Sequence, residues 1–361
     1  MRRWGSWKTG WLLGGMGLLG MVLYQAHGTP PGPGMTPGTG RFIALAAPAS
    51  VALGIRVGET PMSPEEETLM LVVAQPERGR VLWWTHFRVR YVLEFLRPVG
   101  VALDGAGRLW VGEDALNAVF SISARGRRLD FRCWQDAGLL DRPVEFAFGD
   151  RVVLILDNGK GHVLRMEADG PPEVLIGGLT FPTALWLARE TGGVYYRLFV
   201  IDMGRPSWFQ KNQPFVRAYR TDLRWAQALQ EYGRGLLEYP VALVGRDEAL
   251  DVLDGHLSQR FRFDLETGAL REQTGAYGTG PDQWRNPSDM AEVGACRVIV
   301  DTGNDRLVIE AEPASVETCR WASDPPLVEW RARLNRCEPA GVVAADPVST
   351  RNERVVGEAR P

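Results

Sequence analysis

The sequence predicts an all-β fold, a six-bladed β-propeller of four-stranded antiparallel blades. Six prolines recur at spacings of 45, 39, 58, 47 and 52 residues, each ahead of a short apolar segment. In most copies a second apolar segment follows and ends in an acidic residue. These spacings match one four-stranded propeller blade. The 41 glycines and 24 prolines suit many short strands joined by tight turns.

Each proline opens a segment of the kind that forms the inner strand of a blade. Proline fixes φ and lacks an N–H donor, so it suits the first residue of a strand. Val, Leu, Ile and Ala dominate the segments, as expected for strands buried on both faces between neighbouring blades. The segments PVGVALD, PVEFAFG, PTALWLA, PVALVGR, PSDMAEV and PAGVVAAD begin at Pro98, Pro143, Pro182, Pro240, Pro287 and Pro339.

An acidic residue is expected at the turn that leaves each second strand. An aspartate there can accept hydrogen bonds from the backbone of its own turn. Glycines that follow several of these positions supply permissive φ values. The expected turn residues are Asp114, Asp157, Asp202, Asp254 and Asp301, with Gly159, Gly204, Gly255 and Gly303.

The two ends of the chain predict how the ring closes. Residues 67–85 read as the later strands of a blade that lacks its proline strand, and residues 339–358 begin a blade and stop. We therefore expect the C-terminal segment to supply the first strand of a shared blade, which would remove exposed edges. The long step after Pro182 holds a loop and a predicted helix over 222–237, whose apolar face would be Trp225, Leu229, Leu236 and Leu237.

The N-terminal region predicts export from the cytoplasm. Residues 1–28 combine a basic start with an uncharged, mostly apolar run, which is typical of a cleaved signal peptide or a retained signal anchor. Residues 29–64 begin with a Pro/Gly-rich stretch and are expected to be a tether and lead-in, with the propeller over 65–361. The remainder of the chain would lie outside the cytoplasm, secreted, periplasmic or anchored. The net charge is −3 and no basic tract is present, which argues against nucleic acid as a partner.

The four cysteines permit two disulfides in an exported chain. Cys319 and Cys337 are the expected pair because they lie 18 residues apart between two predicted strands. Cys133 and Cys296 would have to pair across the propeller, so two free buried thiols are an alternative for them.

One repeat resembles a known family closely. Residues 275–287 (GAYGTGPDQWRNP) and then 300–307 (VDTGNDRL) resemble the NHL repeat, with its glycine-rich linker, aromatic residue, proline and a strand ending D-x-x-N-x-R. In the repeat headed by Pro98, Asp114 and Asn117 keep part of this pattern, and in the others it has decayed. The resemblance implies a six-bladed propeller and, in many members, a binding platform.

Two carboxylates are candidate metal ligands. At the third position of the proline segments four repeats use Gly or Ala, whereas two repeats that lie opposite in a six-fold ring place Glu145 and Asp289 there. Facing each other at the channel mouth, they could share a cation, which would be Ca²⁺ because hard oxygen ligands favour it. The alternative is two separate solvated carboxylates, or carboxylates paired with nearby arginines such as Arg142.

A surface loop is the candidate for partner binding. Residues 204–215 bring together Arg205, Trp208, Phe209 and Lys211, and aromatic residues with arginine are typical of binding hot spots. Alternatively, the aromatic pair folds back as a plug over the ring. His162 and His256 fall in turns, where a turn-stabilising role is expected, and His86 is explained by packing or by an exposed edge. No elbow, phosphate loop or zinc motif is present in the sequence.

Two functions follow from these expectations. The first is a non-enzymatic binding or scaffold module for protein, peptide or glycan at the outer face of the membrane. The alternative is a calcium-dependent hydrolase or lactonase-like enzyme, which leans on analogy with related six-bladed propellers and on Glu145 and Asp289. A peptide-amidating lyase would need several channel histidines, which the chain does not offer.

Overall fold

The computed structural model describes residues 41–45, 48–56, 68–85, 88–125, 127–136, 138–167, 170–190, 194–204, 214–246, 248–294, 296–311, 330–337 and 340–347. The chain divides into two units, Met1–Thr36 and Pro37–Pro361, and all described residues belong to the second. Within this part of the chain no helix is long and apolar enough to cross a membrane. The predicted signal or anchor segment, residues 1–28, lies outside the described residues.

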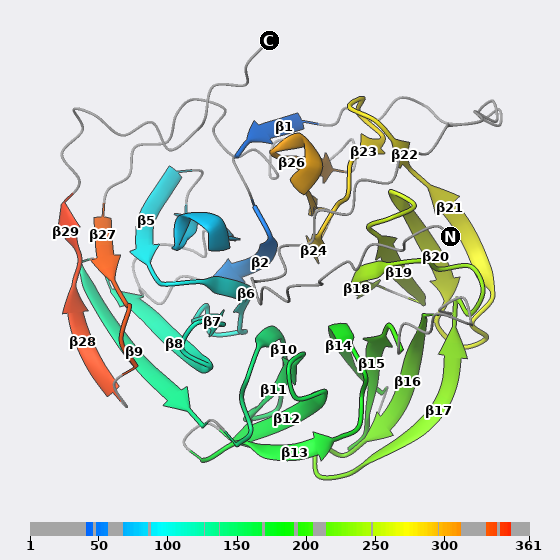
Figure 1. Cartoon of the computed structure of the whole chain (residues 1–361), viewed down its shortest axis with the longest axis horizontal. Helices are drawn as coiled ribbons and strands as arrows, with labels where there is room; N and C mark the ends of the chain where they lie inside the picture. Colours follow the sequence, from blue (N-terminus) through cyan, green and yellow to red (C-terminus); the bar gives the residue numbers. More distant parts are fainter. Residues whose placement is uncertain are drawn as a thin grey trace, which may run out of the picture. The chain divides into compact units, whose positions relative to one another are not determined.

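Six sheets of at least four strands form the blades of a propeller, as predicted (Figure 1). Their innermost strands contact one another in a closed cycle, β2–β6–β10–β14–β18–β24 and back to β2. Blades 1 and 2 are β2 (Ser50–Arg56), β3 (Thr68–Gln75), β4 (Arg80–Thr85) and β5 (Arg88–Glu94), then β6 (Pro98–Leu103), β7 (Leu109–Glu113), β8 (Ala118–Arg125) and β9 (Arg128–Gln135).

The other four blades follow the same order from the axis outwards. Blade 3 is β10 (Pro143–Gly149), β11 (Val152–Asp157), β12 (His162–Glu167) and β13 (Glu173–Ile176). Blade 4 is β14 (Pro182–Arg189), β15 (Tyr196–Asp202), β16 (Phe215–Thr221) and β17 (Ala226–Tyr232). Blade 5 is β18 (Pro240–Arg246), β19 (Ala249–Asp254), β20 (Gln259–Asp264) and β21 (Leu270–Thr274). Blade 6 is β24 (Asp289–Val293), β25 (Cys296–Asp301), β26 (Arg306–Ala311) and β1 (Arg41–Ala44).

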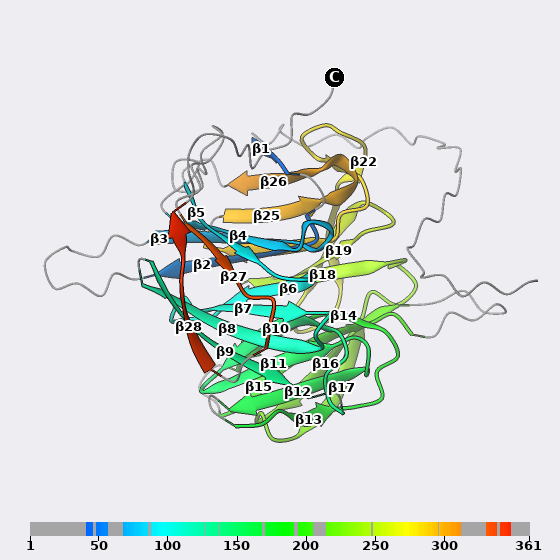
Figure 2. The same ribbon diagram turned by 60° about the vertical axis from the view of Figure 1, so that its left-hand side comes forward.

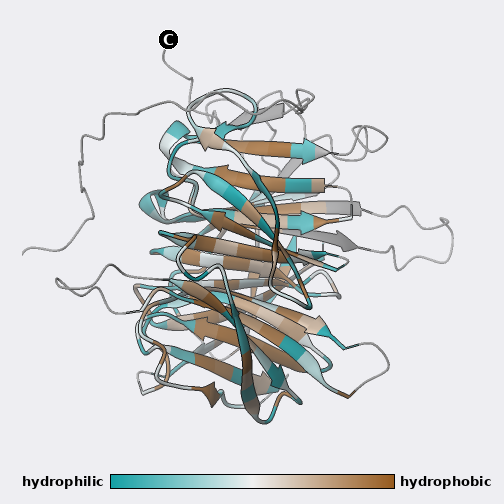
Figure 3. Ribbon diagram, turned by 90° about the vertical axis from the view of Figure 1, so that its right-hand side faces the viewer, coloured by the Kyte–Doolittle hydropathy of each residue, from teal (hydrophilic) through white to brown (hydrophobic). Residues whose placement is uncertain are grey.

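Four inner strands begin with the predicted proline and share one irregularity. The register shifts between the proline and the residue two positions later, at Pro98/Gly100, Pro143/Glu145, Pro182/Ala184 and Pro240/Ala242. Proline cannot donate to the neighbouring strand, so the ladder is interrupted next to it. The apolar residues of the strands lie between adjacent blades, and Figure 3 shows hydrophobic colour along the middle of the strands.

Buried acidic residues at the ends of the second strands hold the entry of the chain into the first strands. Asp254 accepts hydrogen bonds from the backbone N–H groups of Glu238 (2.7 Å) and Tyr239 (2.8 Å), just before Pro240. Asp157, Asp202 and Asp301 make equivalent bonds in their blades. The predicted acids are therefore in place, but their bonds reach back to the proline entry as well as to their own turns.

In blade 2 the acidic residue at the end of the second strand is Glu113 and not the predicted Asp114. Glu113 ends β7, is fully buried and accepts bonds from the N–H groups of Arg97 (2.7 Å) and Leu96 (3.2 Å). Burial raises the pKa of this carboxyl above its usual range. Asp114 lies outside the strand and pairs with Arg97 at 3.0 Å. The longer glutamate side chain of Glu113 has the role that aspartate has in the other blades. Because the residue type differs, the equivalent position was not recognised in the sequence.

The N-terminal segment closes the ring, and the prediction that the C-terminal segment does so was wrong. β1 pairs with β26 as the outermost strand of blade 6, and β2 then forms the innermost strand of blade 1. The hydroxyls of Ser288 and Thr302 donate to the carbonyls of Ala49 and Pro48, each at 3.0 Å. Strands β1 and β2 lie within residues 29–64, which the sequence assigned to the tether and lead-in.

The C-terminal strands lie on the outside of blades 1 and 2 (Figure 2). β28 (Ala340–Ala344) pairs with β9, and β27 (Trp330–Arg333) lies parallel to β5 and also pairs with β29 (Asp346–Pro347). Val342 is 58 % exposed, as is typical of an edge strand and not of an inner one. The segment after Pro339 is therefore a strand, but it does not line the channel.

Cys337 forms a disulfide with Cys133, so the prediction of a Cys319–Cys337 pair was wrong. Pairing of β28 with β9, in which Gly341 lies opposite Phe131, brings the two cysteines together with a Cα–Cα distance of 5.3 Å. The two cysteines are 204 residues apart in the sequence, so their pairing could not be predicted from short-range spacing. Cys296 is also disulfide-bonded, which excludes the alternative of two free thiols, and Cys319 lies outside the described residues.

The predicted helix over 222–237 is not formed, and its middle part is the strand β17 (Ala226–Tyr232). β17 pairs along β16, with Thr221 opposite Ala226 and Val216 opposite Tyr232. Of the expected apolar face, Leu237 is buried, whereas Trp225, Leu229 and Leu236 are exposed. A four-stranded blade needs a partner for the edge of β16, and this pairing overrides the local helical pattern.

Candidate functional site

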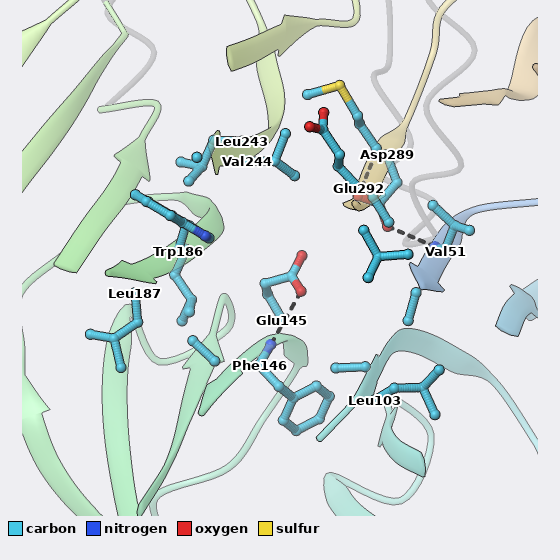
Figure 4. A pocket seen from close by; sticks show the side chains of 18 of the residues that line it. Val51, Leu103, Glu145, Phe146, Trp186, Leu187, Leu243, Val244, Asp289 and Glu292 are labelled. Carbon is cyan, nitrogen blue, oxygen red and sulfur yellow. Dashed lines mark hydrogen bonds between the residues drawn. The ribbon is translucent and has the colours of Figure 1, made fainter. Parts of the chain in front are cut away.

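The candidate site is a cavity of about 390 Å³ on the axis of the propeller. All six inner strands contribute to its wall, and its volume is in the range of small-molecule sites. Its 22 lining residues are apolar or glycine except for four charged ones, which are Glu145, Arg246, Asp289 and Glu292. Figure 4 shows Glu145, Trp186 and Glu292 extending into this space.

Glu145 lies in the cavity wall as the sequence predicted. β10 places it just after the register shift that follows Pro143, and its side chain is partly buried. Its carboxylate accepts a long hydrogen bond from the backbone N–H of Phe146 at 3.3 Å. Burial and then the negative charge of Asp289 raise the pKa of the Glu145 carboxyl well above its usual range. Its charged form is therefore poorly stabilised by the surrounding protein.

Asp289 lines the same cavity from the opposite blade but has more hydrogen-bond partners. Its carboxylate accepts bonds from the N–H groups of Val51 (2.8 Å) and Met290 (2.7 Å), and the Ser50 side chain also bonds to it. Burial nevertheless raises its pKa to about 6. Because Val51 belongs to β2, Asp289 also joins blade 6 to blade 1 and contributes to ring closure.

The alternative in which Arg142 neutralises this pair is not what the structure shows. The Arg142 Nε atom lies 3.9 Å from the Asp114 carboxylate, on the entry side of blade 3. Asp114 also pairs with Arg97, so these three residues form a separate surface group. Within the described part of the chain, no group of three or more His, Cys, Asp or Glu side chains is placed to hold a metal ion.

A second charged group, which the sequence reasoning missed, lies in the wall at the far ends of the inner strands. Glu292 pairs with Arg246 at 3.4 Å and with Arg297. Arg297 in turn contacts Asp251 at 2.8 Å and Glu310 at 3.2 Å. A charged residue near the end of two otherwise apolar segments, PVALVGR and PSDMAEV, was the signal available in the sequence. These mutual pairs make Glu292 a structural charge that also faces the cavity.

The NHL-like residues of blade 6 stabilise a turn. Arg306 pairs with Asp301 at 2.7 Å and donates to the carbonyls of Thr279 (2.7 Å) and Gln283 (2.8 Å) in the glycine-rich linker. Asn304 donates to Gly278 O at 2.8 Å. This part of the motif thus fixes the linker between blades 5 and 6.

The same turn recurs in blade 1 with a different sequence. The short 3-10 turn Pro76–Arg78 and the left-handed Gly79 (φ 57°) match Thr302–Asn304 and Asp305 (φ 50°) of blade 6. Gln75 replaces the aspartate, and its Oε1 accepts a bond from Arg80 Nε at 2.6 Å. The sequence reasoning missed this copy because the acid had become an amide.

The other predicted site residues do not join the cavity. His256 is exposed, with Nδ1 3.4 Å from Glu238, and His162 begins β12 next to its turn, so neither lines it. The candidate binding residues Arg205, Trp208, Phe209 and Lys211, and also His86, lie outside the described residues.

Comparison with known proteins does not identify the chain. No protein-family model and no curated protein matches it, so the NHL family is not confirmed. Similar solved structures include virginiamycin B lyase from Staphylococcus aureus, with 10 % identity, a TM-score of 0.49 and coverage of 76 % of this chain and 99 % of that one. A gluconolactonase from Xanthomonas campestris has 15 % identity, a TM-score of 0.47 and coverage of 77 % and 99 %. Aldose sugar dehydrogenase from Streptomyces coelicolor has 14 % identity, a TM-score of 0.43 and coverage of 76 % and 99 %. Such scores carry no argument about activity, and the strand pairing itself establishes the propeller.

Proposed function

We propose that this chain is a binding propeller whose axial cavity takes a positively charged group of a peptide or glycan ligand. The observation that carries the proposal is the position of Glu145, a carboxylate with few hydrogen bonds in a largely apolar cavity that it shares with Asp289. The ligand would present an amino group, as a lysine side chain, a peptide N-terminus or an amino sugar does.

The energetics favour a cation at this point. A carboxylate in an apolar cavity loses its hydration, and a second carboxylate adds repulsion, so the empty site favours a bound proton. A ligand cation next to Glu145 replaces that proton with a charge-assisted hydrogen bond. Binding is then expected to strengthen as the pH rises, because the carboxyl has to be ionised.

The setting of the proposed module is extracytoplasmic. The Cys133–Cys337 disulfide is typical of oxidising compartments outside the cytoplasm. The N-terminal 28 residues would deliver the chain there, either as a cleaved signal or as a membrane anchor. Residues Arg205, Trp208, Phe209 and Lys211 would add a second contact surface for the same protein, peptide or glycan partner.

A calcium-dependent hydrolase is the second candidate. The observation in its favour is that Glu145 and Asp289 line one cavity from opposite blades, as a shared cation would require. Ca²⁺ takes six to eight oxygen ligands. Glu292 could supply a third carboxylate only by giving up its arginine partners. The described residues therefore fit a singly charged ligand group better than a calcium ion.

Calorimetric titration of the protein at pH 8 with n-butylammonium and, separately, with calcium chloride tests the proposal. Wild-type protein should bind butylammonium, and Glu145→Gln should lose this binding. Glu173→Gln is the matched control, because Glu173 is an exposed side chain on the outer strand β13. Binding of calcium alone, removed by Glu145→Gln, would favour the hydrolase. Absence of binding by either cation would overturn both.

A further inference from the structure

Trp186 is much larger than the residues at the equivalent position of the other inner strands. Strand pairing places this position two residues after that of Glu145. In the other five blades an alanine or a valine occupies it and lines the cavity, and these residues are Ala52, Ala102, Ala147, Val244 and Ala291. Tryptophan at this position brings a large ring and a polar N–H group to the wall of the cavity.

The indole of Trp186 is held by its neighbours with its nitrogen edge toward the cavity. Its ring centroid lies 5.4 Å from that of Phe199, its cross-strand partner. On the next blade, a Cβ atom added at Gly245 would lie 2.1 Å from the six-membered ring, so β18 packs closely against this part of the indole. Figure 4 shows the nitrogen edge directed toward the space that Glu145 enters. The packing of the rest of the ring therefore fixes the position of the N–H group.

The N–H group of Trp186 has no hydrogen-bond acceptor among the described residues. In contrast, Trp110 Nε1 donates to Asp104 at 3.2 Å, as is usual for a buried indole. The unpartnered Nε1 atoms of Trp83 and Trp284 are enclosed by protein atoms, whereas that of Trp186 is not. A ligand in the cavity can therefore reach this donor.

The cavity thus offers a ligand two polar side-chain groups of opposite kind. The Glu145 carboxylate can accept hydrogen bonds, and the Trp186 indole can donate one. The carboxylates of Asp289 and Glu292 already have backbone N–H groups or arginines as partners. Positions two residues apart along a strand differ by about 6–7 Å. A ligand with an ammonium group next to a carbonyl group can cover this span, because each hydrogen bond adds about 3 Å.

A free peptide N-terminus carries this pair of groups, since its α-ammonium group is followed by the first carbonyl oxygen. A lysine side chain has the ammonium group on a chain of methylene groups, so it would leave the Trp186 N–H without an acceptor. An amino sugar offers an acceptor, but its other hydroxyls would face a wall whose side chains are mostly apolar. The same wall suits an apolar side chain on the first residue of a peptide.

We propose that the axial cavity binds the free N-terminus of a peptide whose first side chain is apolar. The α-ammonium group would donate to the Glu145 carboxylate, and the first carbonyl oxygen would accept a hydrogen bond from the indole N–H of Trp186. This inference rests on the proposed function and deepens it by naming the ligand class. Acetylation of the peptide would remove the charge that Glu145 requires, so the site would distinguish a free N-terminus from a blocked one.

Calorimetric titration at pH 7 with L-leucinamide and with 3-methylbutylammonium tests the inference. The two ligands share the ammonium group and the branched alkyl chain, and leucinamide alone has the carbonyl group. At this pH most of the leucinamide is protonated, because an α-amino group has a pKa of about 7.7–8.0. Wild-type protein should bind leucinamide about fivefold more tightly than 3-methylbutylammonium, as one added hydrogen bond allows. N-acetyl-leucinamide should not bind.

Trp186→Phe removes the N–H group and keeps an aromatic ring at this position. This variant should bind leucinamide and 3-methylbutylammonium with equal affinity. Trp225→Phe is the matched control, because Trp225 is exposed and does not line the cavity, and it should keep the preference for leucinamide. The indole ¹H–¹⁵N NMR signal of Trp186, identified by its loss in Trp186→Phe, should shift more with leucinamide than with 3-methylbutylammonium. The melting temperature of each variant shows whether its fold is retained.

The outcomes separate this inference from the proposed function. Equal affinity of the wild-type protein for the two ligands, with both lost in Glu145→Gln, would overturn the inference and leave the proposed function intact. A preference for leucinamide that persists in folded Trp186→Phe would show that the role of Trp186 is wrong. Tighter binding of glucosamine than of leucinamide would replace the peptide with an amino sugar. If no ammonium ligand binds to the wild-type protein, both proposals fail.

Discussion

Burial raises the pKa of Glu145, and the charge of Asp289 raises it further although the two residues belong to opposite blades of the propeller. They are joined by the axial cavity, whose wall is otherwise mostly apolar and screens their charges poorly. The two carboxyls differ in their surroundings, because Asp289 accepts backbone hydrogen bonds from β2 and Glu145 has one long bond from its own strand. Glu145 is therefore the side chain that a ligand can stabilise, and Asp289 is part of the fold.

The free energy of unfolding is expected to depend on the ionisation of these two carboxyls. Both pKa values are raised in the folded chain, that of Asp289 from 3.8 to about 6, so the folded state holds protons more tightly than the unfolded state. The contribution of Asp289 is complete below about pH 4 and is lost as the pH rises through about 6, and that of Glu145 is lost as the pH rises above the usual glutamate range. Glu145→Gln should therefore be more stable than wild type at pH 8, and this difference should disappear at pH 4.

Urea denaturation at pH 4, 6 and 8 measures this difference. Glu173→Gln, on the exposed strand β13, serves as the control and should follow the wild-type profile. Parallel profiles for wild type and Glu145→Gln would show that Glu145 is not perturbed in the folded protein.

Blade 2 offers a paired test of the buried acids that end the second strands. Glu113→Ala leaves the backbone N–H groups of Leu96, Arg97 and Ala115 without their acceptor and should cost about 3 kcal/mol of unfolding free energy. Asp114→Ala removes only the pairs with Arg97 and Arg142 near the surface and should cost about 0–1 kcal/mol. Chemical denaturation of the two variants measures both values. A larger loss of unfolding free energy in Asp114→Ala than in Glu113→Ala would show that Asp114 is the structurally important acid of this blade.

The disulfide is expected to stabilise the ring by fixing the C-terminal strands. It joins residues 204 positions apart, so it removes much of the freedom of the unfolded chain. Replacement of Cys133 and Cys337 together by serine should lower the free energy of unfolding by about 2–5 kcal/mol. Thermal melting of the double variant measures the loss, and peptide mapping without reduction should recover the two cysteines in one linked peptide. Recovery of Cys337 linked to Cys319 would contradict this connectivity.

Closure by the N-terminal segment predicts a sharp boundary for truncation. A variant that lacks residues 2–40 keeps β1 and should melt close to the full chain. A variant that lacks residues 2–49 loses β1 and the carbonyls that Ser288 and Thr302 bind, so its melting temperature should be lower by on the order of 5–10 °C. Equal melting of the two truncated proteins would argue that β1 contributes nothing to closure.

Most of the ring could be predicted from the sequence because each blade is defined by residues that lie close together in the sequence. Pro98, Pro143, Pro182 and Pro240 begin inner strands, as expected from proline and from the need for apolar residues between blades. The position of Glu145 in the channel followed from the same counting.

The remaining features depend on contacts that a local pattern does not contain. Cys133 and Cys337 lie close together because β28 pairs with the edge of β9. The inner strand of blade 1 is β2 and not the C-terminal segment, because β2 is hydrogen-bonded to Asp289 and to β3. Residues 226–232 have a helical pattern, yet the open edge of β16 draws them into a strand. Trp186 was visible in PTALWLA, but its close approach to Gly245 on the next blade was not.

The central claim is that Glu145 takes a cationic group in the axial cavity, and the pKa of its carboxyl tests this most directly. A ¹³C NMR titration of the Glu145 carboxyl, identified by its absence in Glu145→Gln, can be recorded with and without n-butylammonium. We predict a pKa well above the usual glutamate range in the free protein and a fall toward that range when the cation is bound. An ordinary pKa in the free protein that the cation does not change would contradict the account.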